Sequence, residues 1–251
     1  MKRHLIMIIV ALSAAIPAPL MAGDSTRVKP YFKSDALPNG VLWLPVPPDS
    51  MSAGYAYDMH RFLWGKEQRL DADRAAMAKV DADYTPTTML KVFSAPCGVE
   101  MSKEKTPLTY EMLTKLAMTG AEMGHKAKEF YNRKRPFVVF GQPSLVPEHD
   151  AALAKNGSYP SGHTIYGWVS ALVFIEIFPE CADQIALRGL QYAESRVIVA
   201  AHWQSDIEAG QKEAAVLYAF LHSDPTFFKE LEKVKKELHK AKANEKLTPK
   251  N

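Results

Sequence analysis

The stretch GSYPSGHTIYGWVSALVFIEI, residues 157–177, passes from a turn rich in glycine and proline into a strongly apolar run. Trp168, Leu172 and Ile175 recur at the spacing of one helix face, so the run predicts a helix over residues 161–177. A helix with so little polar surface must be covered by other segments. The fold therefore depends on which parts of the chain supply that cover.

The neighbouring segments also show helical periodicity. Thr106 and Pro107 place a polar cap before a proline at the first helical position, which is typical of a helix start. Leu108, Met112 and Leu116 then mark the expected buried face of this helix. No stretch alternates as a strand does, so the sequence predicts an all-α fold, a compact single-domain helical bundle. One predicted helix begins at residue 52 and another begins at residue 224. Between them, helices are predicted over residues 106–133, 161–177, 182–200 and 206–222.

The first 22 residues differ from the rest of the chain. A basic start, MKRH, precedes an uncharged run at residues 5–16, and Ala22 offers a small residue for cleavage. This order is typical of a secretory signal peptide, so we expect residues 1–22 to be removed and the mature protein to be periplasmic. No other segment has the roughly 20 apolar residues that a membrane span needs. We therefore expect no membrane association once the leader is cleaved.

Helix breakers dominate the region that follows. Residues 23–50 hold several prolines and an Asn-Gly pair, too many for a helix, and they show no strand-like alternation. This predicts an extended N-terminal arm at 23–50, lying on the surface of a helical domain at 51–251.

Charge and cysteine content narrow the function further. Without Lys2 and Arg3 the chain holds 29 basic and 28 acidic residues, a balance that gives no reason to expect a nucleic-acid partner. Cys97 and Cys181 would meet an oxidising compartment after export. Two cysteines are compatible with one disulfide or with two separate buried thiols, and the sequence leaves both open.

A first candidate cluster lies at the end of the helix predicted over residues 106–133. Lys128 and Arg135 are seven positions apart, close to two helical turns, so both cations are expected on one helix face. Two cations so placed would repel each other without an anion between them. The alternative is a solvated basic face, because Lys126, Arg133 and Lys134 crowd the same stretch.

A second cluster is Ser161-Gly162-His163, at the start of the helix predicted over 161–177. The first N–H groups of a helix lack partners within it and carry the positive end of its dipole. Gly162 would let the backbone approach a ligand without a Cβ in the way. This arrangement is a phosphate cradle. An ordinary helix start, with Ser161 as N-cap and a solvated His163, explains the same residues.

A third cluster combines Arg196, His202 and Asp206. His202 and Asp206 are four residues apart, so a helix would place the carboxylate beside the imidazole. A carboxylate on one ring nitrogen fixes the tautomer and leaves the other nitrogen free to attack. Arg196 does not share that helix face, so we expect the helix to break near residues 201–203. The alternative is a surface ion pair.

Together, and in this order, the three clusters resemble a known signature. The segments KEFYNRKRP, PSGH and SRVIVAAHWQSD match Lys-x6-Arg-Pro, Pro-Ser-Gly-His and Ser-Arg-x5-His-x3-Asp of the type 2 phosphatidic acid phosphatase (PAP2) superfamily. The fuller wordings GSYPSGHT and AHWQSD resemble the bacterial class A non-specific acid phosphatases. The resemblance covers about residues 38–240. It implies an all-α bundle of the PAP2/haloperoxidase type.

The resemblance also implies roles for the site residues. His202 would attack phosphorus and form a phosphohistidine, Asp206 would orient it, and His163 would protonate the leaving group and then activate water. The phosphate oxygens would be held by Lys128, Arg135, Ser161, Gly162 and Arg196. These cations stand where many phosphatases use a metal, so the expected activity is acid phosphatase action on small phosphate monoesters with no cofactor. Phosphoryl transfer to other acceptors is chemically open.

Three other functions are compatible with the same residues. An apyrase-like enzyme would cleave nucleoside di- and triphosphates, and a vanadium haloperoxidase would hold vanadate in the same cradle, although those chains are usually much larger. A non-catalytic periplasmic anion-binding protein would use the cradle alone. The apolar stripe from Phe227 to Leu238 and the arm predict a homodimer contact, or packing within one chain.

Overall fold

The computed structural model describes residues 28–247, and the predicted leader at 1–22 lies outside them. The described residues form helices and no strand, which confirms the all-α prediction. The α-helices are α1 (Ala53–Glu67), α2 (Ala72–Val80), α3 (Pro86–Cys97), α4 (Pro107–Tyr131), α5 (Pro136–Phe140), α6 (Asp150–Leu153), α7 (Gly162–Ile177), α8 (Ala182–Ile198), α9 (Gln204–Leu221) and α10 (Pro225–Leu247).

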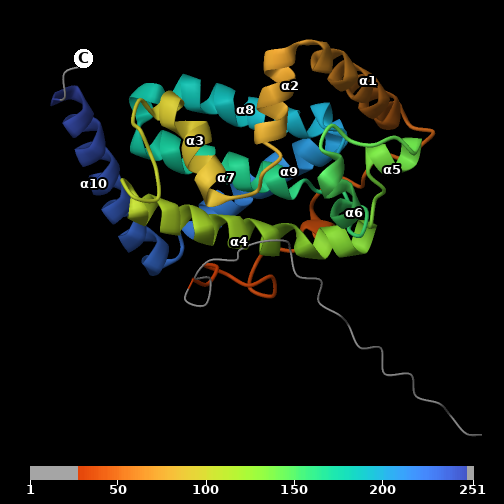
Figure 1. Ribbon diagram of the computed structural model, residues 1–251. Coiled ribbons are helices and arrows are strands. Elements are labelled where there is room, and N and C mark those ends of the chain that lie inside the picture. The colour runs from red at the N-terminus through yellow and green to blue at the C-terminus, as the bar shows by residue number, and fades with distance from the viewer. Residues whose placement is uncertain (1–27, 248–251) are drawn as a thin grey trace, which may run out of the picture.

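Helix α7 lies in the middle of the bundle and contacts α9, α8 and α4 (Figure 1). Ile165 and Tyr166 are fully buried, whereas Trp168, Leu172 and Ile175 are only partly buried. The face that the periodicity indicated is therefore the less covered side of a helix that is surrounded almost all round. Because α7 is held on so many sides, its first turn is a fixed platform for the residues around it.

Polar caps and prolines fix where the helices begin. Ser52, Thr85 and Ser161 each accept a hydrogen bond from a backbone N–H in the first turn of α1, α3 and α7. Asp71 accepts two such bonds at the start of α2. Proline occupies the first position of α3, α4 and α10. Helices α2 and α3, which the periodicity did not predict, contact α8 and complete the cover of the core.

Helix α10 packs across α4 at one end of the molecule (Figure 1). Phe227, Leu231, Val234 and Leu238 are all buried in the main core. Packing within the chain thus accounts for this stripe. The homodimer stays a prediction, for which the stripe supplies no exposed surface.

A carboxylate of α10 caps α4. Glu237 accepts hydrogen bonds from the backbone N–H groups of Leu108 (3.0 Å) and Thr109 (2.9 Å), which lack partners within α4. Met112 and Leu116 are buried as predicted, but Leu108 is 41% exposed. The expected buried face therefore starts one turn later, because the first turn of α4 meets the Glu237 carboxylate instead of an apolar surface.

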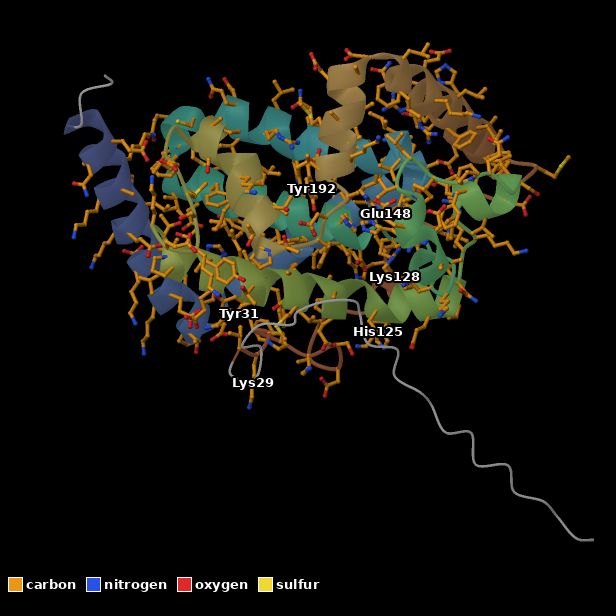
Figure 2. All side chains as sticks on the ribbon, viewed as in Figure 1. Lys29, Tyr31, His125, Lys128, Glu148 and Tyr192 are labelled. Carbon is orange, nitrogen blue, oxygen red and sulfur yellow. The ribbon has the colours of Figure 1, made fainter. Side chains whose placement is uncertain are left out.

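The arm contains no α-helix over its described residues, 28–50, and runs beside α4 (Figure 2 marks Tyr31). Leu44 is buried in a small cluster between the arm and the helices. Tyr159 donates its hydroxyl to the backbone carbonyl of Pro45. The arm therefore contacts the loop that leads into α7.

Both cysteines are free thiols: Cys97 ends α3 and Cys181 immediately precedes α8. Cys181 Sγ lies 3.9 Å from the Cys97 carbonyl oxygen, so the two residues are neighbours. Within residues 28–247, no helix combines the length and the apolarity of a membrane span.

Candidate active site

The three predicted clusters meet at the first turn of α7. The backbone N–H of Ser161 donates to the carbonyl oxygen of Asp206 at 3.0 Å, which joins the second cluster to the third. Lys128 Nζ donates at 2.6 Å to the carbonyl oxygen of the residue just before Ser161, which joins the first to the second. Arg135 Nη1 lies 3.0 Å from His202 Nε2. Residues far apart in the sequence thus face one small region.

Lys128 and Arg135 reach this region by different routes, which corrects the expectation that they share a helix face. Helix α4 ends at Tyr131, because Asn132 takes a left-handed φ of 38°. Arg135 lies beyond this break, in extended backbone at the N-cap of α5. The two cations therefore approach the site from separate segments.

The Arg135 guanidinium is held by backbone and amide oxygens. Nε donates to the Leu153 carbonyl (2.8 Å), Nη1 to the Ala201 carbonyl (2.9 Å) and Nη2 to Asn156 Oδ1 (2.6 Å). Burial and the nearby Arg196 cation lower the pKa of Arg135 to about 9. The side chain is thus fixed in place, and no carboxylate of the described part of the chain contacts it.

A break after α8 confirms the one predicted near residues 201–203. Helix α8 ends at Ile198 and α9 begins at Gln204. Ala200 takes a left-handed φ of 66°, and the N–H of His202 donates back to the Arg196 carbonyl at 3.2 Å. This turn folds the chain back on itself, so that His202 and Arg196 reach the same place.

His202 lies before α9 and not on it, which corrects the helical pairing expected with Asp206. Trp203 is the N-cap of α9, and Asp206 is the third helical residue, whose Oδ2 accepts the Trp203 N–H at 2.8 Å. His202 Nδ1 lies 3.4 Å from the same Oδ2, a close contact without hydrogen-bond geometry. A helix cap therefore sets the distance between the imidazole and the carboxylate.

Two buried arginines, Arg135 and Arg196, and the partly buried Lys128 lie around a centre where no carboxylate of the described residues pairs with them. Arg196 is fully buried, and its three guanidinium nitrogens have no hydrogen-bond partner within the described chain. Burial lowers the pKa of Arg196 to about 10, and burial together with Arg135 lowers the pKa of Lys128 to about 7. Burying unpaired cations costs several kcal/mol per ion. The arrangement therefore calls for an anion.

The first turn of α7 leaves room for that anion. Ser161 Oγ accepts the backbone N–H of Thr164 at 3.3 Å, as an N-cap does. A Cβ built at Gly162 would meet only Lys128 Cε, at 3.7 Å. The helix start, with its positive dipole end, thus opens toward the same cations.

His163 is held by the backbone of a distant segment. Its Nε2 lies 3.0 Å from the Ala82 carbonyl oxygen, and its ring packs edge-on against Tyr84, 4.9 Å between centroids. Burial, and then the Arg196 cation, lower the pKa of His163 well below its usual value. Burial, and then the Arg135 and Lys128 cations, do the same to His202. In the empty site both histidines therefore favour the neutral form more strongly than a free imidazole does.

Comparison with known proteins identifies the family. The PAP2 superfamily model matches residues 109–227, a range that includes every predicted site residue. The non-specific acid phosphatase of Salmonella typhimurium is 40% identical over 225 residues, covering 88% of this chain and 90% of that protein. The chain belongs to the PAP2 superfamily. The non-specific acid phosphatase of Providencia stuartii is 36% identical over 235 residues, covering 92% and 94% of the two chains.

This PAP2 superfamily member also uses residues that sequence reasoning missed. Arg133, which the alternative interpretation placed on a solvated face, donates to Asp206 Oδ1 and to Asp58 Oδ2, at 2.7 Å each. Asp58 in turn accepts the N–H of Ser205 at 2.8 Å. Nothing in the sequence pointed to this chain of contacts, because Asp58 lies on α1, 75 residues before Arg133.

A buried carboxyl group accompanies the cations without neutralising them by contact. Glu213 on α9 is fully buried, and neither of its oxygens has a hydrogen-bond partner among the described residues. Burial raises its pKa to about 8, an effect that the Lys128 cation opposes. Glu213 is therefore protonated at acidic pH and leaves the positive charge of the site intact.

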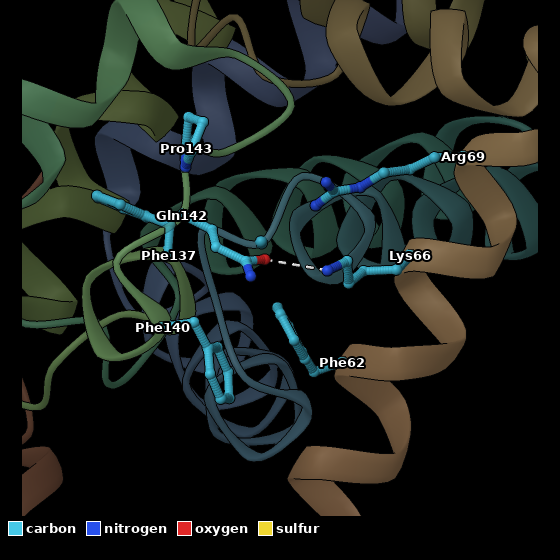
Figure 3. A pocket seen from close by; sticks show the side chains of 8 residues that line it. Phe62, Lys66, Arg69, Phe137, Phe140, Gln142 and Pro143 are labelled. Carbon is cyan, nitrogen blue, oxygen red and sulfur yellow. Dashed lines mark hydrogen bonds between the residues drawn. The ribbon is translucent and has the colours of Figure 1, made fainter.

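A small surface pocket lies on the other side of the turn before His202 (Figure 3). Phe62 and Phe140 stack in its wall, 4.5 Å between centroids, and Lys66 donates to Gln142 at 3.0 Å. Ala200 is its nearest link to the histidines, and none of the predicted site residues lines it. Within residues 28–247, no group of three or more His, Cys, Asp or Glu side chains is placed to hold a metal ion.

Proposed function

We propose that this protein is an exported acid phosphatase, which hydrolyses phosphate monoesters of broad structure through a phosphohistidine and without a metal ion. Its relatives in Salmonella typhimurium and Providencia stuartii are named non-specific acid phosphatases, and the likeness covers most of each chain. The observation that carries the proposal is Arg196, a buried guanidinium with no hydrogen-bond partner among residues 28–247, placed with Lys128 and Arg135 beside the imidazole of His202.

The cations bind the phosphate group of the substrate. The guanidinium of Arg196 supplies donors to the oxygens, and Lys128, Arg135 and the amide of Gly162 supply further positive charge around them. These groups are fixed before the substrate arrives, so they stabilise the charge on the transferring phosphoryl group without reorganising.

His202 is the nucleophile of the first step. Nδ1 faces Asp206, so Nε2 is the nitrogen that attacks phosphorus. The new N–P bond forms as the P–O bond to the leaving group breaks, and the electron pair of that bond stays on the leaving oxygen. His163 donates a proton to this oxygen. Asp206 stabilises the positive charge that develops on the His202 ring.

Water completes the reaction in a second step. His163, now neutral, takes a proton from the water as its oxygen attacks phosphorus. The N–P bond breaks, and its electron pair returns to His202 Nε2. Both histidines end in their starting states, so the cycle needs no further reactant.

The pH dependence follows from the charges around His163. Burial and Arg196 lower its pKa in the empty site, whereas a bound phosphate dianion raises it again. The acid form is therefore populated in the substrate complex at acidic pH and is lost as pH rises. We expect the activity to fall on the alkaline side.

Trapping the intermediate tests the proposal. The wild-type enzyme is mixed with an aryl phosphate at acidic pH, quenched in alkali, which preserves phosphohistidine, and digested for mass spectrometry. We expect one phosphoryl group on the peptide that contains His202, and none in His202→Ala. A phosphoryl group on another residue, or full turnover by His202→Ala, would contradict the covalent route. Activity that requires an added divalent ion after chelation would contradict metal independence.

Export and assembly are separate parts of the proposal. Cleavage after Ala22 would give a periplasmic protein, and N-terminal sequencing of the mature chain from the periplasmic fraction tests it. The homodimer is tested by sedimentation of the mature chain. A mature chain that retains residues 1–22, or sediments as a monomer, would remove the respective statement without affecting the chemistry.

A further inference from the structure

The acid–base histidine depends on a turn that no motif contains. Within the described chain, His163 has no carboxylate partner, and its ring hydrogen bond goes to the Ala82 carbonyl oxygen at 3.0 Å. A carbonyl oxygen only accepts, so the nitrogen that faces it, Nε2, carries a proton. Nδ1 is therefore the nitrogen left to exchange a proton with the substrate. Ala82 lies in the turn between α2 and α3.

A buried carboxylate anchors this turn to α8. Asp81 is fully buried and accepts both terminal nitrogens of Arg188, Nη1 at 3.1 Å. Its Oδ2 also accepts the hydroxyl of Ser195 at 2.7 Å, and Arg74 donates to the same hydroxyl at 2.9 Å. Asp81 thus holds the position of the next residue, whose carbonyl faces His163. Ser195 and Arg188 both belong to α8, the helix that carries Arg196.

We propose that Asp81 is a positioning residue for proton transfer: by anchoring the turn that carries the Ala82 carbonyl, it keeps the His163 ring aligned with Nδ1 toward the leaving oxygen. This inference rests on the proposed function. In the step concerned, the P–O bond breaks, its electron pair stays on the leaving oxygen, and the proton passes to that oxygen from His163 Nδ1. In hydrolysis of the phosphohistidine, the proton of water returns to Nδ1.

Leaving groups of different basicity test the proposal. Dinitrophenolate leaves without a proton, whereas an alkoxide needs one, so only the alkyl ester depends on His163 as acid. In Asp81→Asn we expect kcat/KM for an alkyl phosphate to fall by about tenfold or more and kcat/KM for dinitrophenyl phosphate by about twofold or less. The ratio kcat/KM is the right quantity, because it ends at release of the leaving group and excludes the water step.

Asp58→Asn is the matched control, because Asp58 is equally buried and acts on the nucleophile side through Arg133. It should lower kcat/KM for both esters by similar factors, since both need His202. Equal losses on the two esters in Asp81→Asn, or no loss, would overturn the positioning role. If Asp81→Asn does not fold, Ser195→Ala, which removes one hydrogen bond to the same carboxylate, decides by the same ratio.

His163→Ala separates this inference from the proposed function. The variant should discriminate between the two esters more strongly than Asp81→Asn. If His163→Ala loses both esters equally, His163 is not the acid and the proposed mechanism fails with it. If His163→Ala discriminates and Asp81→Asn does not, the mechanism stands and only the role of Asp81 is lost.

Discussion

The two histidines of the site have different groups beside them. His202 has a carboxylate beside it, Asp206, which Arg133 and the Trp203 N–H fix in place. His163 has a backbone carbonyl, that of Ala82. The difference matches the proposed chemistry, because His202 must become positively charged when phosphorylated, whereas His163 must give its proton away. A carboxylate would stabilise the first state and oppose the second.

The largest difference in activity should appear between the variants that lack the His202 imidazole and those that lack the His163 imidazole. We expect His202→Ala to lower kcat by about 10⁴-fold or more on any phosphate ester, because no neighbouring group can replace the nucleophile. His163→Ala should approach wild-type kcat/KM on dinitrophenyl phosphate. His125→Ala, on the exposed side of α4, is the matched control and should change neither. A kcat of His202→Ala comparable to that of the wild type would show that His202 is not the nucleophile.

The next largest effect is expected from Asp206, the carboxylate beside His202. Asp206→Asn should lower kcat by about 100-fold, less than His202→Ala, because the nucleophile remains but loses the charge that stabilises its cationic form. The loss should be the same for good and poor leaving groups. A loss confined to esters with poor leaving groups would show that Asp206 supports the proton donor and not the nucleophile, which would contradict the proposed roles.

Glu213 is a buried carboxyl group of the site that contacts neither histidine. The pKa of Glu213, raised to about 8 by burial, exceeds its unfolded value of about 4.3. Its contribution to stability is therefore lost as pH rises between these values, and Glu213→Gln should raise the free energy of unfolding by about 4–5 kcal/mol at pH 8 and leave it unchanged at pH 4. Urea unfolding at both pH values measures this, with exposed Glu148→Gln as control. Equal stability of Glu213→Gln and the wild type at pH 8 would show that the carboxyl group is not buried unpaired.

Anion binding should report on both histidines together with Lys128, whose pKa is also lowered in the empty site, to about 7. Their pKa values are lowered in the empty site by burial and cations, and a bound dianion raises them, so binding takes up protons. Sulfate is a suitable probe because it does not itself titrate in this range. Its Kd should tighten by up to about tenfold per pH unit for each proton taken up as pH falls below about 6.5. Calorimetry in two buffers counts those protons, and a pH-independent Kd would contradict the account.

The smallest effect concerns the turn that carries His202. Ala200 has a left-handed φ of 66°, which causes steric strain that glycine would avoid. Ala200→Gly should relieve part of that strain and change the free energy of unfolding by less than about 1 kcal/mol, because lost packing against Phe62 and Trp203 offsets it. Thermal unfolding measures the change, and kcat should stay within about twofold. A large loss of activity would show that the Ala200 methyl group positions His202.

The surroundings of the two histidines also show what the sequence could and could not predict. Lys128, Ser161-Gly162-His163 and Arg196–His202–Asp206 were placed at one site because family motifs mark them. The pairings of Asp58 with Arg133 and of Asp81 with Arg188 could not be predicted, because each joins residues 75 or 107 positions apart. The helical periodicity located α7 and α10. It missed α2, which buries only Ala78, and α3, although α3 buries an apolar face that includes Met89, Leu90 and Phe93.

Local geometry was harder to predict than composition. Spacing alone suggested that Lys128 and Arg135 share a helix face, but the left-handed Asn132 ends α4 between them. Four-residue spacing likewise suggested a helical pair for His202 and Asp206, which a capping interaction brings together instead. In both cases the residues converge as expected, and a break in the helix brings them there.

A crystal structure with vanadate bound would show directly whether the two histidines lie on opposite sides of one phosphoryl group, because vanadate takes the geometry of a phosphoryl group in transfer. We predict a bond from His202 Nε2 to vanadium, His163 Nδ1 beside the opposite apical oxygen, and Arg196 donating to the equatorial oxygens. Vanadate bound in another cavity, or His163 turned away from the apical oxygen, would contradict this prediction.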